Sequence, residues 1–391
     1  MRSSPQDEEF RRRIRDWLAD NLTGRFAALI GAGGPGREHE AHAERLAWNR
    51  HLAAAGWTCL GWPPEHGGRG ATLAQQVIFY EEYARARAPA RVGYLGEELL
   101  GPTLIAFGTP EQQRRFLPRI AAVEELWCQG YSEPGAGSDL AAVATTARLD
   151  GDQWVITGQK VWTSLAMEAD WCFVLARTQP GSRRGEGLSY LLVPMRQRGV
   201  TVRPIRQLTG TSEFNEVFFD GARTDVGLVV GEAGDGWRVA RATLAIERGV
   251  ATLGQQVGFE RELQRLVELA RQAGASGDPL IRDRLGRAWI GLEAMRAHAL
   301  RTLAAEPGEG TGTGPSELKL LWSRWHQELG ELAMDVLGAP SMVARGAPYD
   351  LDDWQRLFLF SRADTIYGGS DEIQRTIIAE RALGLPRQAR A

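Results

Sequence analysis

The hydrophobic positions follow a helical period over the first third of the chain. Residues at the i, i+4, i+7 and i+8 spacing of one helix face are Phe10, Ile14, Trp17 and Leu18. The same period predicts a second helix over about 38–55. Thr72 and Thr109 stand where two further helices are predicted to begin, because a threonine hydroxyl caps the free N–H groups of a first turn. We therefore expect residues 1–125 to form an N-terminal α-helical domain.

The period changes from about residue 128. Short runs rich in β-branched and aromatic residues, separated by turn residues, predict strands. The runs are TTARL, QWVITGQKVW, WCFVLART, LSYLLVPM, VTVRPI and EVFFDGART. Asp150-Gly151 lies between the first two runs and is a strong signal for a two-residue hairpin. We expect residues 126–233 to form a compact central β domain, either a small barrel or a sandwich.

The helical period returns after Gly236 and holds to Leu383, with a glycine-rich loop predicted over Pro307–Pro315. Residues 234–391 are therefore expected to form a C-terminal bundle of the four-helix type. The predicted fold class is α+β, in the order helices, β domain, helices. Because ligands often bind where domains meet, we expect the functional site where the β domain contacts the helices.

Composition narrows the function classes. The 391 residues are 43% hydrophobic and 24% charged, as in globular proteins, and the net charge of −3 gives no reason to expect a nucleic-acid partner. No apolar run is long enough to span a membrane, and the first residues lack the apolar core of a secretory signal. Three cysteines without a CxxC pattern indicate reduced thiols. We expect a cytoplasmic protein. Only two of the 46 basic residues, Lys160 and Lys319, are lysines.

The segment from Cys128 to Asp139, CQGYSEPGAGSD, lies between the predicted N-terminal helices and the β domain. Its glycines allow positive φ angles and a close approach of the backbone N–H groups to a ligand, while Pro134 stiffens the turn. Its hydroxyl and carboxylate side chains are suited to orienting a polar ring or a thioester. An ordinary glycine-rich loop is the alternative interpretation.

The strings YSEPGAGSD, QKVWTS, IERG and IYGGSDEIQR, in that order, resemble the acyl-CoA dehydrogenase family of FAD flavoproteins over nearly the whole chain. The resemblance implies that Trp162 packs on the isoalloxazine ring and that Thr163 and Ser164 bond to its polar edge, although a strand tryptophan can equally be core. It implies that Ser138 touches the pantetheine arm of a coenzyme A thioester. The cofactor-binding residues implied are Gln129, Tyr131, Ser132, Gly137, Ser138, Trp162, Thr163, Ser164, Ser370 and Glu372.

The general base is the informative departure. Many family members carry a catalytic glutamate in an IYEGT motif, whereas the matching residue here is Gly368. Members of the isovaleryl-CoA and long-chain type place the glutamate earlier, just before an arginine, which matches Glu247 and Arg248. The resemblance therefore makes Glu247 the candidate base and Arg248 a candidate substrate-binding residue. It implies that the Gly368 N–H and a ribityl hydroxyl bind the thioester carbonyl. A solvated Glu-Arg pair is the alternative.

Two further departures concern assembly. Family homotetramers usually complete a neighbour's FAD through an R-x-x-F-G segment and a Q-x-x-G-G segment. After Arg271 the chain reads QAGASGDPLIRDR without FG, and Asp335 and Ala339 replace the glutamine and the second glycine. This pattern resembles actinobacterial members that work as α2β2 hetero-oligomers, or it is a different solution to the same contact. We expect a dimer or tetramer, homomeric or heteromeric, with the apolar face of residues 371–383 as a candidate subunit contact.

The resemblance implies an enzyme that converts an acyl-CoA thioester to the trans-2-enoyl-CoA. Glu247 would remove the α-proton, the β-hydride would pass to flavin N5, and an electron-transfer flavoprotein would accept the electrons. Three alternatives stay open. They are a dehydrogenase for an acyl-carrier-protein thioester, a non-catalytic partner subunit, and an oxidase or monooxygenase of the same family.

Overall fold

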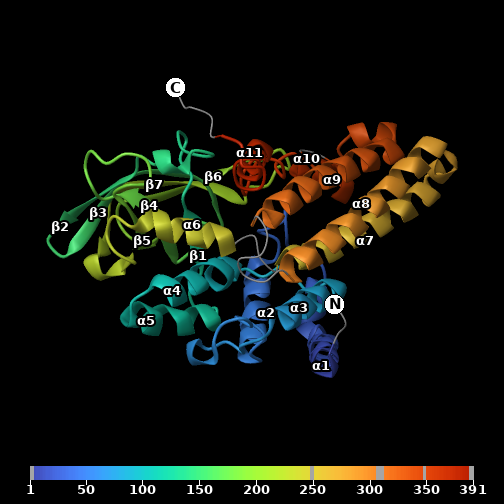
Figure 1. Ribbon diagram of the computed structural model, residues 1–391. Coiled ribbons are helices and arrows are strands. Elements are labelled where there is room, and N and C mark those ends of the chain that lie inside the picture. Colours follow the sequence, from blue (N-terminus) through green and yellow to red (C-terminus); the bar gives the residue numbers. More distant parts are fainter. Residues whose placement is uncertain (1–3, 247–250, 305–311, 347–348, 387–391) are drawn as a thin grey trace.

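The structure is a computed structural model that describes residues 4–246, 251–304, 312–346 and 349–386. The helices of the first third lie below the β region, and a second group of helices, yellow to orange, extends away from it to the right (Figure 1). The N-terminal helices are α1 (Pro5–Asn21), α2 (His42–Ala54), α3 (Leu73–Arg85), α4 (Gly101–Phe107) and α5 (Pro110–Ala121). A π-helical turn, Leu95–Leu100, leads directly into α4. This order of helices, sheet and helices confirms the predicted α+β fold class.

Both predicted N-caps are confirmed. The Thr72 hydroxyl accepts from the backbone N–H of Gln75 at the start of α3, and Thr109 does the same with Gln112 at α5. In each case the glutamine side chain bonds back to the cap residue, which completes a capping box. Helix α2 begins four residues later than predicted.

The late start of α2 follows from a buried arginine. Arg45 is fully buried and its Nη1 donates to the backbone carbonyls of Glu38 and Glu40, 2.6 and 3.2 Å away. These carbonyls therefore satisfy the guanidinium instead of serving as acceptors in a helix, and the chain turns at Ala41 with φ of 45° before α2 starts.

The central region is one eight-stranded sheet. Its strands are β1 (Trp127–Gly130), β2 (Thr146–Asp150), β3 (Gln153–Ser164), β4 (Trp171–Arg177), β5 (Leu188–Pro194), β6 (Val200–Ile205), β7 (Phe214–Asp225) and β8 (Val229–Val230). The strand order is β6-β7-β3-β2-β4-β5-β8, and β1 pairs with β4. The sheet curls, since Thr224 Oγ1 on β7 donates to the Leu192 carbonyl on β5. The predicted β2–β3 hairpin is confirmed, but its two loop residues are Gly151 and Asp152, because Asp150 pairs with Gln153.

The second helical region consists of α6 (Gly236–Ile246), α7 (Ala251–Gln272), α8 (Pro279–Ala304), α9 (Gly314–Leu337), α10 (Asp353–Ser361) and α11 (Asp371–Arg381). Helix α9 packs against α7, α8, α10 and α11, while α6 packs against β5, α4 and the π-helical turn. Within the described parts of the chain, no helix combines the length and apolarity needed to cross a membrane.

One hydrophobic core joins the three regions. Leu95 and Leu99 of the π-helical turn, Tyr131 after β1, Tyr190 of β5 and Val239 of α6 belong to the same buried cluster. The end of β1 is therefore fixed against both helical regions, and the segment that follows it lies at their junction.

Candidate functional site

A buried ion pair anchors the segment Ser132–Asp139 to the sheet. Lys160 on β3 is fully buried, and its Nζ lies 2.7 Å from Glu133 Oε1, 2.7 Å from the Leu175 carbonyl and 3.1 Å from the Tyr131 carbonyl. Glu133 also accepts from the backbone N–H groups of Ala144 and Thr145. The Glu133 carboxylate and the Lys160 ammonium thus hold both ends of the loop to the sheet.

The charges of this pair are tuned by burial and by each other. Burial raises the pKa of the Glu133 carboxyl, but the Lys160 charge and the bonds from Lys160, Thr145 and Ala144 outweigh it, so the pKa lies below the ordinary value. For Lys160, burial outweighs the attraction of Glu133 and lowers the pKa to about 8. Around neutral pH the pair is ionised, and the carboxylate has a partner for each oxygen.

The two loop glycines do not have the positive φ that was one expectation. Neither Gly135 nor Gly137 is among the residues with positive φ, and a Cβ built on either would meet nothing within 4 Å. Ser138 beside them is exposed. The open surface over Gly135 and Gly137 agrees with the other expectation, a close approach of a ligand to the backbone.

Trp162 is an exposed tryptophan held in an unfavourable backbone conformation. In β3, Lys160 pairs with Val217 and Thr163 with Asn215, so Val161 and Trp162 together face one residue of β7 and form a β-bulge. Trp162 has φ of 60° and is 58% exposed, with Phe214 edge-on to its indole at 6.2 Å. A bulky residue in the left-handed region costs free energy and marks a candidate functional position.

At this bulge the buried atoms Thr163 Oγ1 and Asn215 Oδ1, on residues that pair across β3 and β7, have no protein partner within the described residues. Thr163 is 1% exposed and its Oγ1 is unpaired, and Gln129 Nε2 at the end of β1 is likewise buried without an acceptor. The Val161 N–H donates to the Ser132 carbonyl at 2.9 Å, so the bulge and the loop are adjacent. An unmet buried donor or acceptor is costly. Together with the open indole face, these atoms fit a flat ring with a polar edge.

Tyr131, Ser132 and Ser164 have mostly structural contacts. The Tyr131 ring is buried edge-on to Phe173 and Tyr190, at 5.9 and 6.1 Å. Ser132 and Ser164 are half-buried. The Ser132 backbone carbonyl accepts from the Val161 N–H in the bulge, and Ser164 follows Thr163 in β3. The structure thus brings two short segments side by side: one from Gln129 on β1 through Tyr131 to Ser132, and one with Trp162, Thr163 and Ser164 on β3.

The segment that carries Gly368 is fixed by buried side chains of α9 and α11. Gln374 is fully buried, and its Nε2 donates to the Gly368 and Gly369 carbonyls, each at 3.1 Å. Gly368 has φ of +63°, and a Cβ there would lie 3.9 Å from the Lys319 ammonium. The Gly368 N–H donates no hydrogen bond to the described residues. That N–H remains available to a ligand.

Ser370 and Glu372 have local roles at the start of α11. The Ser370 hydroxyl oxygen accepts from the Ile373 N–H at 3.4 Å and caps the helix. Glu372 lies in the first turn and is exposed, and bonds from its own backbone N–H and from the Ser370 hydroxyl lower its pKa. Neither feature points to a cofactor, so their assignment stays a prediction.

Glu247 and Arg248 lie outside the described residues. The described chain ends at Ile246, the last residue of α6, and resumes with Ala251 at the start of α7. The candidate base therefore rests on its sequence position between these two helices.

The sequence analysis did not identify the residues that fix the Ser132–Asp139 loop and the segment that carries Gly368. Lys160 and Lys319, the two lysines of the chain, are 0% and 6% exposed and both donate to backbone carbonyls. Their rarity among 46 basic residues was the available signal. The sequence analysis also missed His326, whose two ring nitrogens bond to the carboxylates of Asp364 and Glu262.

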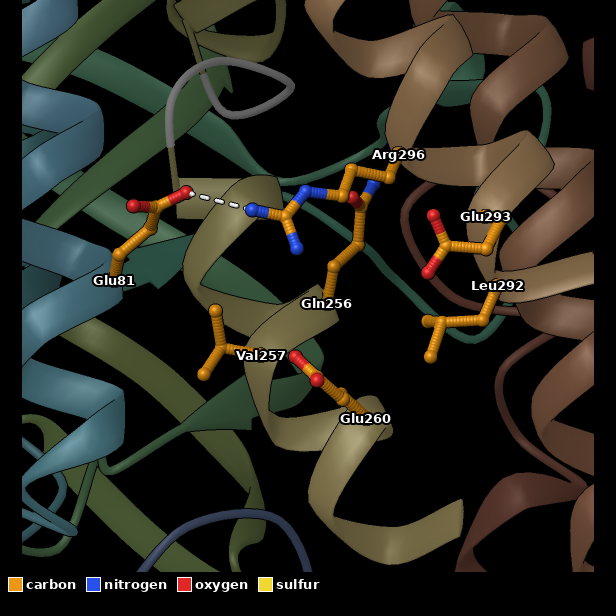
Figure 2. Close-up of a pocket in the computed structure, with 7 residues that line it drawn as sticks. All are labelled: Glu81, Gln256, Val257, Glu260, Leu292, Glu293 and Arg296. Atoms are coloured by element: carbon orange, nitrogen blue, oxygen red, sulfur yellow. Dashed lines mark hydrogen bonds and ion pairs between the residues drawn. The ribbon is translucent and has the colours of Figure 1, made fainter. Parts of the chain in front are cut away.

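A small cavity lies away from this site, between α3, α7 and α8 (Figure 2). Its volume of about 10 Å³ has room for one water. The Glu81 carboxylate reaches Arg296 across it at 3.5 Å, and the buried Oε1 of Gln256 has no partner among the described residues.

The residue that replaces the expected FAD-binding glutamine is engaged within the chain. Asp335 on α9 forms an ion pair with Arg284 on α8, and both side chains are more than a third exposed. The carboxylate thus has a cationic partner on its own chain.

Three sequence models of one family match consecutive parts of the chain. The acyl-CoA dehydrogenase N-terminal, middle and C-terminal domains match residues 4–124, 128–222 and 234–383. The chain is 70% identical over 383 residues to the acyl-CoA dehydrogenase IpdE1 of Mycobacterium tuberculosis, covering 98% of this chain and 99% of that protein. It is 65% identical over 394 residues to IpdE1 of Mycolicibacterium smegmatis, with 98% and 99% covered.

Solved structures agree over the whole length. The Tcur3481-Tcur3483 steroid ACAD superposes with a TM-score of 0.85 at 30% identity, covering 99% of each chain. The ChsE4-ChsE5 complex of Mycobacterium tuberculosis superposes with a TM-score of 0.82 at 32% identity and the same coverage.

Proposed function

The chain belongs to the acyl-CoA dehydrogenase family, whose members are FAD-dependent oxidoreductases, and we propose that it oxidises the Cα–Cβ bond of an acyl-CoA to the trans-2-enoyl-CoA. When bound, FAD supplies the acceptor for the hydride that leaves the β-carbon. The residues of the chain supply the ring site, a base for the α-proton and a donor to the thioester carbonyl.

The observation that carries this proposal is the strained bulge at Trp162. An exposed indole at φ of 60° beside the unpartnered Thr163 Oγ1 has no structural advantage in the protein alone. It offers a flat apolar face and a hydrogen-bonding group side by side, which an isoalloxazine ring requires. The Lys160–Glu133 pair keeps the neighbouring loop, with Gly137 and Ser138, at the edge of this surface.

Glu247 is the proposed base. The α-proton of a thioester is only weakly acidic, so its removal needs a carboxylate whose proton affinity is raised by an apolar surrounding. Gly368 cannot take a proton, and Glu247 follows directly on α6, which packs against the π-helical turn and the core around Tyr131. Arg248, the next residue, is the proposed contact for the coenzyme A part of the substrate.

Gly368 is proposed to donate its N–H to the thioester carbonyl. Removing the α-proton pushes charge onto that oxygen, and a fixed donor at that point stabilises the charge more in the transition state than in the ground state. Two observations support the role. The N–H has no acceptor among the described residues, and Gln374 holds the Gly368 carbonyl on the other side.

We propose that the chain works in an oligomer with a second, related chain, and that a steroid-derived acyl-CoA is the first substrate to test. The relatives at 30% and 32% identity are two-chain assemblies, and one is named a steroid ACAD. The Asp335–Arg284 ion pair and the missing FG segment fit a chain that does not complete a neighbour's FAD in the homotetramer manner. An electron-transfer flavoprotein is the proposed electron acceptor.

The test is anaerobic titration of the flavin-loaded protein with straight, branched, aromatic and steroid-derived acyl-CoA esters. Loss of the flavin's visible absorbance, with a product lighter by two hydrogens, is expected for at least one ester. A protein that holds FAD but is reduced by none of them contradicts the proposal. Rapid oxygen consumption without added acceptor identifies an oxidase, and reduction only by acyl-carrier-protein thioesters identifies that alternative.

A further inference from the structure

A chain of polar contacts, buried at its centre, runs from α7 through α9 to the residue before Gly368. His326 on α9 donates from Nδ1 to Asp364 Oδ2 at 2.6 Å and from Nε2 to Glu262 Oε2 at 3.1 Å. Asp364 is 1% exposed, and its other oxygen accepts from the Tyr367 hydroxyl at 2.8 Å. None of these side chains is part of the proposed base, of the Trp162 bulge proposed to bind the flavin, or of the contact to the Gly368 carbonyl.

His326 must carry a charge for these contacts to exist together. Both ring nitrogens face carboxylate oxygens, which only accept, so both nitrogens must be protonated. Burial lowers the pKa of His326, but the Glu262 charge and the bonds that the imidazole donates to both carboxylates outweigh it and raise the pKa to about 10. The Phe259 ring covers the imidazole at 4.7 Å. Asp364 is therefore held by a rigid, charged donor.

Lys319 adds a second support to the same residue. Its ammonium donates to the backbone carbonyl of Asp364 and lies 4.3 Å from the Tyr367 ring centroid and 4.1 Å from that of Trp322. The charged groups around Asp364 are thus Glu262 from α7, and Lys319 and His326 from α9, with the Tyr367 hydroxyl from its own segment. Asp364 is fixed at both its carboxylate and its carbonyl.

The last residue in this chain of contacts, Tyr367, directly precedes Gly368, whose N–H is the proposed donor to the thioester carbonyl. The Tyr367–Gly368 peptide contributes the Gly368 N–H, and its orientation depends on where Tyr367 is held. Tyr367 is held at its hydroxyl by Asp364 and on its ring face by Lys319, while Gln374 fixes the Gly368 carbonyl. Because Gly368 lacks a side chain, the direction of its N–H depends on the contacts of Tyr367 and on the bond to its own carbonyl.

We infer that Asp364 is a positioning residue that aims the Gly368 N–H at the thioester carbonyl, through the Tyr367 hydroxyl and with His326 as its charged support. Asp364 has this role only if Gly368 receives the thioester, so it rests on the proposed function. The hydrogen-bond strength at the carbonyl is then set by a group that never touches the substrate.

The test compares Tyr367→Phe and Asp364→Asn with wild type in the flavin-loaded protein, with its partner chain if one is needed. Tyr367→Phe keeps the ring on Lys319 and removes the hydroxyl that donates to Asp364. The probe is the enoyl-CoA made from the ester that reduces the wild type fastest, labelled with heavy carbon at the thioester carbonyl. Its carbonyl stretching frequency reports the strength of the donated hydrogen bond.

For both variants we expect the bound carbonyl frequency to move toward the value in water-free solvent and the flavin-reduction rate to fall roughly tenfold. Loss of a whole oxyanion donor costs about 10²–10³, and a displaced donor should cost less. Substrate affinity and flavin content should change little. Trp48→Phe is the control, because it removes a buried bond of the N-terminal helices, from Trp48 on α2 to the Tyr83 hydroxyl on α3. It should lower thermal stability without moving the frequency.

An unchanged frequency and rate in Tyr367→Phe, with wild-type flavin reduction intact, would overturn the role of Asp364 and leave the proposed function standing. A wild type that no acyl-CoA reduces refutes the proposed function itself. If Asp364→Asn does not fold, Tyr367→Phe decides alone, since loss of one hydroxyl from a ring that is 38% exposed leaves the packing in place.

Discussion

Lys160 and Glu133 join the third strand of the sheet to the loop after the first strand, with 2.7 Å between Nζ and Oε1 and both side chains buried. The pair is 27 residues apart in sequence and fixes the backbone that precedes Gly135 and Gly137. Through the Tyr131 carbonyl, the same ammonium reaches the end of the segment that carries Gln129. The loop is therefore preorganised before any ligand binds.

Breaking this pair should both destabilise the protein and weaken FAD binding. Lys160→Met leaves the Glu133 carboxylate buried with only two backbone donors, and loss of one partner of a buried ion pair costs about 3–5 kcal/mol. Thermal unfolding and flavin content of the purified protein measure the two effects. The double variant with Glu133→Gln should recover part of the stability, because no unpaired charge remains. Equal losses in the single and double variants would show that the charge pairing is unimportant.

Trp162→Ala should reduce FAD retention by roughly tenfold or more, because stacking and buried area on the ring are lost. Apoprotein stability should change little, since Trp162 is 58% exposed and its φ of 60° is already unfavourable. Flavin occupancy after gel filtration measures the effect. Leu149→Ala, at a similarly exposed position on β2, is the control and should keep its flavin. Full flavin occupancy in Trp162→Ala would mean that the indole does not pack on the flavin ring.

Glu247→Gln should retain FAD but slow flavin reduction by roughly 10²–10⁴, the usual contribution of a general base. Anaerobic stopped-flow reduction by the best acyl-CoA is the measurement. Glu260→Gln, which removes a different carboxylate on α7, is the control, and its flavin should be reduced at the wild-type rate. A near wild-type rate in Glu247→Gln would falsify the assignment of the base.

A glutamate at the alternative position should rescue this variant only weakly. In Glu247→Gln/Gly368→Glu, the new side chain starts 3.9 Å from the Lys319 ammonium, which favours the ionised carboxylate and lowers its basicity. The φ of +63° at Gly368 adds about 1–2 kcal/mol of strain for a residue with a Cβ. Rescue to more than a few per cent of the wild-type rate would show that the site accepts a base from either wall.

The stabilising contribution of His326 to the free energy of unfolding should decrease as the pH rises from about 6.5 to 10. Its folded pKa of about 10 lies above the unfolded value, so its contribution is complete below about 6.5 and is lost as the pH rises through 10. The slope is at most about 1.4 kcal/mol per pH unit. Lys160, with its lowered pKa of about 8, contributes with the opposite sign above pH 8. The melting temperatures of wild type and His326→Gln should therefore converge toward pH 10, and a constant difference from pH 6.5 to 10 contradicts the assignment.

The protein expressed alone should bind FAD weakly or assemble poorly, whereas co-expression with a related chain should yield a flavin-loaded hetero-oligomer. The expectation follows from the Asp335–Arg284 pair, which engages the residue at the position where family homotetramers contact a neighbour's FAD. Mass in solution and flavin per chain are the measurements. One tightly held flavin per chain in a homo-oligomer would exclude a required second chain. In that case Arg284→Ala should leave the assembly unchanged.

The sequence by itself determined the fold class, the strands and the start of the capped helices. These features depend on local patterns, such as the period of apolar residues or the hydroxyl of Thr72 and Thr109, and the structure confirms them. The motif strings also identified the family, which the similarity to known proteins confirms. The domain boundaries and the assigned site residues remain predictions.

Only the tertiary structure decided how the site is held. Long-range partners such as Lys160 with Glu133, or His326 with Asp364, are 27 and 38 residues apart, and no sequence period relates them. The bulge at Trp162 depends on pairing with β7, which lies more than 50 residues further on. The two lysines stand out in the sequence, yet their function follows from burial. A compact ammonium can donate to several backbone carbonyls in a small space, and only folding brings those carbonyls together.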